Sequence, residues 1–164
     1  MKRTSQRRLR PVTALAVLLL FLNCTSAIAQ PQQQHVHHMA PGVMPFDVSE
    51  TVHFFRMTES GGVERVVTRD QDAADQIALI QQHLQHEAAR FQRGDYSDPA
   101  ALHGATMPGL KELQTGIPKI KVSYTPLPAG AQITFQTADV HLLTAIHRWF
   151  GAQLSEHGAD AKAE

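Results

Sequence analysis

The sequence predicts an α+β domain: two β-hairpin-plus-helix units whose four strands form an antiparallel sheet with the helices on one face. Three observations lead to this prediction. Two segments alternate apolar and polar residues around a Gly-containing turn, which is typical of β-hairpins. Each hairpin ends in a Thr-x-Asp sequence, at residues 68–70 and 137–139. After each of these, apolar residues recur every three or four positions, as in an amphipathic helix.

The first unit is expected to have strands over residues 52–58 and 63–68, joined by a turn at residues 59–62. The helix that follows has an apolar stripe formed by Ile77, Ile80, Leu84, Ala88 and Phe91. Two short helices are expected next. Asp98-Pro99 supplies an N-cap and a first-turn proline for one that Gly104 ends, and Met107-Pro108-Gly109-Leu110 starts another.

The second unit repeats this order. Its strands alternate at Ile120, Val122 and Tyr124 and again at Ile133 and Phe135, with a turn at residues 126–130 between them. The last helix has a stripe formed by Val140, Leu143, His147, Phe150, Leu154 and His157.

The first 29 residues have the order of a signal peptide. A basic segment is followed by an apolar run from Val12 to Leu22 and by Ala27-Ile28-Ala29, so cleavage is predicted after Ala29. The apolar run has about 11 residues, whereas a membrane-spanning helix needs roughly 20. We therefore expect a periplasmic or secreted protein without a membrane anchor.

Three further parts follow the signal peptide. Residues 30–45 are rich in Gln, Pro, His and Met and lack apolar periodicity, which predicts a flexible arm. Residues 46–158 are expected to form a single domain, and residues 159–164 a disordered tail.

Signal removal would change the composition of the chain. The mature part keeps 10 of the 15 Lys and Arg residues and all 15 Asp and Glu, a net charge of −5 with neutral His. This charge argues against nucleic acid or an anionic membrane as a partner. Cys24, the one cysteine, would be lost, which excludes thiolate sites and covalently attached haem. All ten histidines remain, so a site is expected to use imidazole.

His147 interrupts the apolar stripe of the last helix, where a buried imidazole needs a partner. It is interpreted as a core histidine bonded to a backbone carbonyl, as a metal or haem ligand, or as an acid or base. His83 shares a helix face with His86 and Glu87, an arrangement that suits a metal ion. The core candidate ligands, drawn from strand, helix and loop positions, are His53, His83, His103, Met107 and His147.

The arm offers a second candidate metal site, made of His35, His37, His38 and Met39. Imidazole binds copper, zinc and nickel alike. The thioethers of Met39, Met44 and Met107 favour copper, and cuprous copper in particular.

Several segments carry a family resemblance: Met44-Pro45-Phe46-Asp47, Thr51-Val52-His53-Phe54-Phe55, Gly94-Asp95-Tyr96-Ser97-Asp98-Pro99-Ala100, His103-Gly104 with Met107-Pro108-Gly109-Leu110, and His147-Arg148-Trp149-Phe150. In them the chain resembles a family of small exported proteobacterial proteins of unestablished activity, sometimes labelled aspartate carbamoyltransferase. The chain lacks the Ser-Thr-Arg-Thr and His-Pro-x-Gln motifs of true carbamoyltransferases, so the residues do not support that label.

The leading hypothesis is a periplasmic protein that binds a metal ion or metal cofactor, copper first and haem second. The first alternative is a cofactor-free interaction domain with structural or pH-responsive histidines. The second is a small hydrolytic enzyme that pairs His147 with a carboxylate such as Glu87. The sequence lacks a nucleophile elbow, a phosphate loop, a His-Glu-x-x-His motif and a dinucleotide fingerprint. Convergence of the candidate ligands in space would distinguish the hypotheses.

Overall fold

The fold was analysed in a computed structural model that describes residues 26–164. It confirms the predicted α+β class. The predicted signal peptide lies outside the described residues except for its last four, which belong to the first helix. Among the described residues, no helix is long and apolar enough to cross a membrane.

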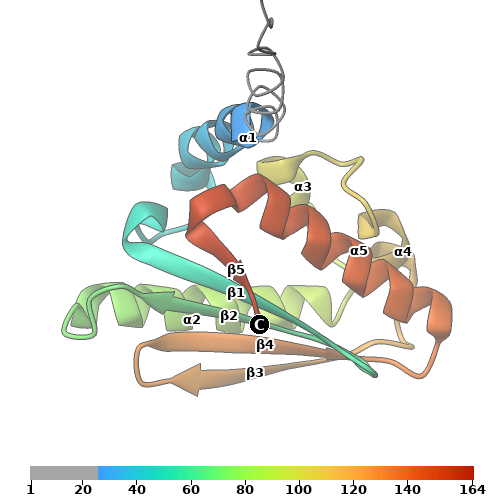
Figure 1. The fold of residues 1–164 in the computed structure, drawn as a ribbon. Coiled ribbons are helices and arrows are strands. Elements are labelled where there is room, and N and C mark those ends of the chain that lie inside the picture. Colours follow the sequence, from blue (N-terminus) through green and yellow to red (C-terminus); the bar gives the residue numbers. More distant parts are fainter. Residues whose placement is uncertain (1–25) are drawn as a thin grey trace, which may run out of the picture.

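A five-stranded sheet in the order β3-β4-β2-β1-β5 forms one layer of the molecule (Figure 1). The two predicted hairpins are present, one formed by β1 (Thr51–Thr58) and β2 (Gly61–Thr68), the other by β3 (Lys121–Leu127) and β4 (Gly130–Gln136). The hairpins join through antiparallel pairing of β2 with β4.

The sheet differs from the predicted four-stranded antiparallel one, because a fifth strand makes it mixed. The predicted tail, residues 159–164, instead holds the end of η3 (Gly158–Asp160) and all of β5 (Ala161–Ala163), and β5 pairs in parallel with the free edge of β1. Backbone groups at that edge would otherwise lack partners in the sheet, which is the physical reason for the added strand.

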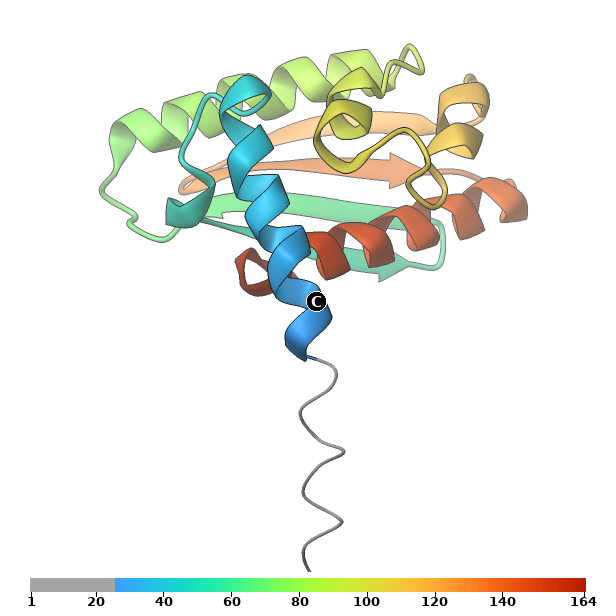
Figure 2. The ribbon, with the colours of Figure 1, turned by 90° about the horizontal axis from the view of Figure 1, so that it is seen from above.

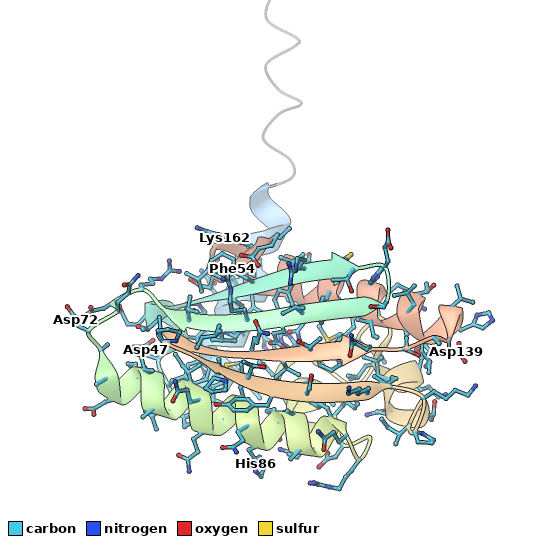
Figure 3. The ribbon with its side chains drawn as sticks, turned by 90° about the horizontal axis from the view of Figure 1, so that it is seen from below. Asp47, Phe54, Asp72, His86, Asp139 and Lys162 are labelled. Atoms are coloured by element: carbon cyan, nitrogen blue, oxygen red, sulfur yellow. The ribbon has the colours of Figure 1, made fainter. Side chains whose placement is uncertain are left out.

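All five α-helices cover the same face of the sheet (Figure 2). They are α1 (Ser26–Met39), α2 (Ala74–Phe91), α3 (Ser97–His103), α4 (Leu110–Thr115) and α5 (Val140–His157). The opposite face is turned to the viewer in Figure 3, where Phe54 of β1 and its register partner Lys162 of β5 are labelled.

The strand register decides which side chains face the helices. His53 and Phe55 are two residues apart in β1, so both point to the same side. In the register, Phe55 lies opposite Glu64 of β2, and Glu64 lies opposite Ile133 of β4. Ile133 and Phe55 are core residues, so Glu64 points into the helix-covered side of the sheet.

The core lies between the sheet, α2 and α5. Trp149 of α5 is fully buried and packs edge-on against Phe91 of α2, Phe135 of β4 and Tyr96, with ring centroids 5.5 to 5.8 Å apart. The buried face of α5 differs from the predicted stripe. It carries Trp149 where the prediction had His147, and Val140 is 65% exposed.

The segment predicted as a flexible arm is instead helical, forming α1 and η1 (Ala40–Gly42). Val36 and Ala40 lie four residues apart, so they share one face, and both are buried. Asp160 of η3 fastens this segment to the C-terminus, because its carboxylate accepts hydrogen bonds from Gln33 Nε2 at 2.8 Å and His37 Nε2 at 2.6 Å. Arg69 Nη2 donates to the same carboxylate at 2.8 Å.

Candidate functional site

A cavity of about 40 Å³ lies between the sheet and the helices. Four imidazoles from four different elements line it: His53 of β1, His83 of α2, His103 of α3 and His157 of α5. A water molecule needs a cavity of roughly 10 to 15 Å³ on this measure. The cavity therefore suits an ion or a few small atoms.

The side chain of His53 lies in the cavity wall, without a hydrogen bond among residues 26–164. It is nearly fully buried, and neither ring nitrogen has a partner within the described residues. A carboxyl group lies nearby, since Glu64 Oε1 is 4.0 Å from His53 Nδ1. Burial lowers the pKa of His53 to about 3, so its ring is neutral at physiological pH.

The ring of His157 contacts the rings of both His53 and His103. The rings of His53 and His157 stack with centroids 4.5 Å apart, and the His103 ring lies 5.0 Å from that of His157. His157 Nδ1 is buried and has no partner in the part of the chain that the structure describes. Burial and the neighbouring imidazoles place the pKa of His157 well below its usual value, so this ring is neutral too.

His103 is oriented by a second carboxylate. Its Nδ1 lies 2.8 Å from Glu156 Oε2. A carboxylate oxygen accepts hydrogen bonds, so Nδ1 of His103 donates to Glu156, and Nε2 is the ring nitrogen that this bond leaves free. This is the arrangement that commonly orients histidines which bind metals.

His83 reaches the cavity from α2. Its ring contacts Phe46 edge-on, with centroids 5.6 Å apart. Burial lowers the pKa of His83 to about 4. All three cavity histidines with shifted pKa values are therefore neutral at pH 7, and neutral imidazole is the form that binds metal ions.

Three carboxyl groups, those of Glu64, Glu87 and Asp98, also line the cavity. Burial raises the pKa of Glu64 to about 7 and, together with the nearby Asp98, raises that of Glu87 to about 8. Arg90 Nη1 donates to Glu87 Oε1 at 3.2 Å and also pairs with Asp98. The raised pKa values of Glu64 and Glu87 reduce the negative charge that these two side chains bring to the cavity near neutral pH.

Trp149 and Gln153 complete the polar part of the wall. Trp149 Nε1 is buried without an acceptor in the described residues, and a buried unpaired N–H costs roughly 1 to 3 kcal/mol. Gln153 is only 5% exposed. The wall therefore offers several polar groups to an occupant.

The structure brings together three of the five predicted core ligands. His53, His83 and His103 face the cavity, whereas Met107 is buried in the core and His147 lies elsewhere. His147 Nε2 is 2.9 Å from the carbonyl oxygen of Gly61 and 3.0 Å from that of Thr58. Since carbonyls only accept, Nε2 donates to both, and His147 matches the interpretation as a hydrogen-bonded core histidine.

The predicted arm ligands do not share a site in α1. His35 and His38 are exposed, Met39 is partly buried, and His37 bonds Asp160. The hydrolytic pair is not formed either, since Glu87 lines the cavity and His147 bonds the backbone between β1 and β2.

The cavity imidazoles are close together but do not form a coordination shell as they stand. Within residues 26–164, no three His, Cys, Asp or Glu side chains are arranged to hold a metal ion. The rings of His53 and His157 illustrate the reason. An imidazole binds a metal through a lone pair in the plane of the ring, and the lone pairs of two nearly parallel, stacked rings do not converge on one ion. Metal binding would require these side chains to rotate.

Sequence reasoning missed His157 and Glu64 as cavity residues. His157 ends the apolar stripe of α5, and that position was a usable signal of its burial. Glu64 could have been found from the hairpin register, which places it opposite Phe55. The sequence around Trp149 is compatible with an ordinary core residue, and nothing in it indicates that the side chain borders a cavity.

Comparison with protein-family models, with curated proteins and with solved structures finds no match for this chain. The fold and site define an α+β protein with a buried cavity lined by histidines. Its function is therefore argued from that cavity, and the family resemblance seen in the sequence stays a prediction.

Proposed function

We propose that this protein binds a transition-metal ion, copper in the first place, in the cavity lined by His53, His83, His103 and His157. One observation carries the proposal: four imidazoles from β1, α2, α3 and α5 border the same buried space. Imidazole is a good ligand for copper, and nothing in the described sheet or helices gives these rings another shared purpose.

The protonation of the cavity supports the proposal. A histidine binds a metal only through an unprotonated nitrogen, and burial keeps His53, His83 and His157 neutral. Neither ring nitrogen of His53 has a hydrogen-bond partner among residues 26–164, and the bond to Glu156 engages Nδ1 of His103 rather than Nε2. Ligation would therefore break no hydrogen bond at either residue.

The size of the cavity favours an ion over haem. A volume of about 40 Å³ holds an ion with one or two waters, whereas a porphyrin is many times larger. Haem would have to displace one of the helices that cover the sheet.

We also propose that the protein acts in the periplasm or as a secreted protein. The order of basic segment, apolar run and Ala27-Ile28-Ala29 supports this.

Copper titration of the tag-free chain tests the proposal, with Cys24→Ser throughout so that the one thiol does not bind metal. We expect one copper ion per chain at sub-micromolar dissociation constant, roughly −8 kcal/mol or better. His157→Leu and His103→Leu should each weaken binding at least about tenfold.

His147→Gln is the matched control, because it changes a histidine of α5 outside the cavity. It should leave the copper affinity unchanged. Binding weaker than about micromolar, or equal binding by the His157→Leu and unchanged chains, would overturn the proposal. The interaction-domain alternative expects that result.

A further inference from the structure

The thioether side chains indicate which copper ion the cavity prefers. Among residues 26–164 Met44 is the one methionine in the cavity wall. Met57 is 44% exposed on β1, Met107 is buried in the core, and Met39 is on α1. Within residues 26–164, one sulfur-bearing side chain therefore borders the cavity that the four imidazoles line.

The backbone around Met44 is held in place on both sides. Before it, Val43 N and Met44 N both donate to the carbonyl oxygen of Ala40, at 2.9 and 2.7 Å. After it, Phe46 is buried, and its ring lies 5.6 Å from that of His83 and 6.4 Å from that of His53. These contacts fix the backbone on either side of Met44, two residues before the ring that meets His53 and His83.

The chemistry of a thioether differs from that of an imidazole in its selectivity. Imidazole binds copper, zinc and nickel, whereas the soft thioether sulfur favours cuprous copper. Zinc sites use thiolate, imidazole and carboxylate ligands. In a cavity wall with four imidazoles and one thioether, the thioether is therefore the ligand expected to raise the affinity for cuprous copper above that for zinc.

We propose that Met44 supplies a thioether ligand that makes the histidine-lined cavity selective for cuprous copper over zinc. The proposal rests on the proposed function, because Met44 can contribute selectivity only if the imidazoles bind a metal. It also gives the segment after α1 a role, since that segment carries the sulfur to the cavity.

Packing alone is the other explanation for Met44, because methionine often fills irregular gaps in cores. The two explanations predict different effects of Met44→Leu. Leucine has a similar volume and is usually tolerated at a methionine position, so it removes the sulfur and keeps most of the packing.

The experiment measures Cu(I) affinity under anaerobic reducing conditions by competition with a chromophoric chelator, and Zn(II) affinity in the same way. It uses the tag-free chain with Cys24→Ser. Met44→Leu should lower Cu(I) affinity at least about tenfold and leave Zn(II) affinity within about twofold. Met107→Leu, the control for a buried methionine outside the cavity, should change neither.

Several outcomes would decide the question. If the unchanged chain binds Cu(I) and Met44→Leu binds it equally well, the thioether proposal is wrong and the proposed function stands. Equal losses for both metals would also overturn it, since they indicate a packing role. If the unchanged chain binds neither metal, both proposals fail.

X-ray absorption on the Cu(I)-loaded, unchanged chain gives a second test that does not depend on the folding of a variant. We expect one sulfur neighbour in addition to nitrogen neighbours. A shell of nitrogen neighbours alone would overturn the role of Met44.

Discussion

His53 and His147 both lie on the helix-covered side of the molecule but have opposite hydrogen-bonding states. His53 is buried with no partner for either ring nitrogen within the described residues. His147 is partly buried and donates to two backbone carbonyls. An unpaired buried polar group costs free energy, whereas a paired one contributes roughly 0.5 to 1.5 kcal/mol. The two residues should therefore respond oppositely to replacement by leucine.

His53→Leu should raise the free energy of unfolding of the metal-free protein by about 1 kcal/mol, because it removes two unpaired buried nitrogens and keeps an apolar side chain in the space. The same change should weaken copper binding. Urea denaturation in the presence of a chelator measures the first effect. A loss of stability would show that His53 has a partner in solution.

His147→Leu should lower the free energy of unfolding by about 1 kcal/mol, because the carbonyls of Thr58 and Gly61 lose their shared donor. Urea denaturation checks it, with Thr144→Ala on an exposed turn of α5 as control. An unchanged stability would mean that water replaces the imidazole as donor.

At the scale of elements, tertiary contacts decide the structure of both ends of the domain. The segment before Phe46 has no helical periodicity, yet Val36 and Ala40 are buried and α1 forms. Asp160 accepts hydrogen bonds from Gln33, His37 and Arg69, so one carboxylate joins α1, η3 and the loop after β2. Such a contact joins residues more than 90 positions apart, which local patterns do not reveal.

Asp160→Ala should loosen α1 selectively. The change removes an acceptor that three donors share, and each charge-assisted hydrogen bond contributes roughly 1.5 to 3 kcal/mol. Hydrogen exchange should show faster exchange at residues 31–40, while β4 stays protected. Asp72→Ala, at an exposed position before α2, is the control. Uniformly faster exchange would indicate global rather than local destabilisation.

For the whole molecule, the cavity groups make stability depend on pH in two opposing ways. The pKa values of His53, His83 and His157 are lowered from 6.5, so the unfolded chain binds more protons and stability falls as pH drops below about 6.5. The pKa values of Glu64 and Glu87 are raised from 4.5 to about 7 and about 8. The folded chain therefore holds extra protons, and stability falls as pH rises through that range.

The metal-free protein should be most stable near pH 6.5. Between pH 4.5 and 6.5 the three histidines make stability rise with pH and the two glutamates make it fall, so the larger number of histidines gives a net rise. Above pH 6.5 only the two glutamates still contribute, and stability falls. Urea denaturation from pH 5 to 9 measures the profile. Glu64→Gln should flatten the decline above pH 6.5. A stability that keeps increasing to pH 8 would contradict the raised pKa values.

The sequence predicted the parts of the molecule that depend on local order. The alternation of apolar and polar residues predicted both hairpins, and the apolar stripe of Ile80, Leu84 and Phe91 predicted α2. Parallel pairing of β5 with β1 was not predictable, because it follows a turn of the chain after His157 that brings distant residues together. His53, His83 and His103 were found as site residues from their type and position. His147 was predicted on the buried stripe of α5, but the buried face of that helix is rotated and carries Ile146, Trp149 and Gln153, so His147 does not meet the cavity.

Trp149 gives the molecule a built-in optical probe. It is the only tryptophan in the sequence, and its indole ring lies in the cavity wall within an aromatic cluster. Its fluorescence therefore comes from a single known position, so no label is needed to follow events there. An occupant that accepts a hydrogen bond from Nε1 should shift the emission, and a cupric ion in the cavity should quench it.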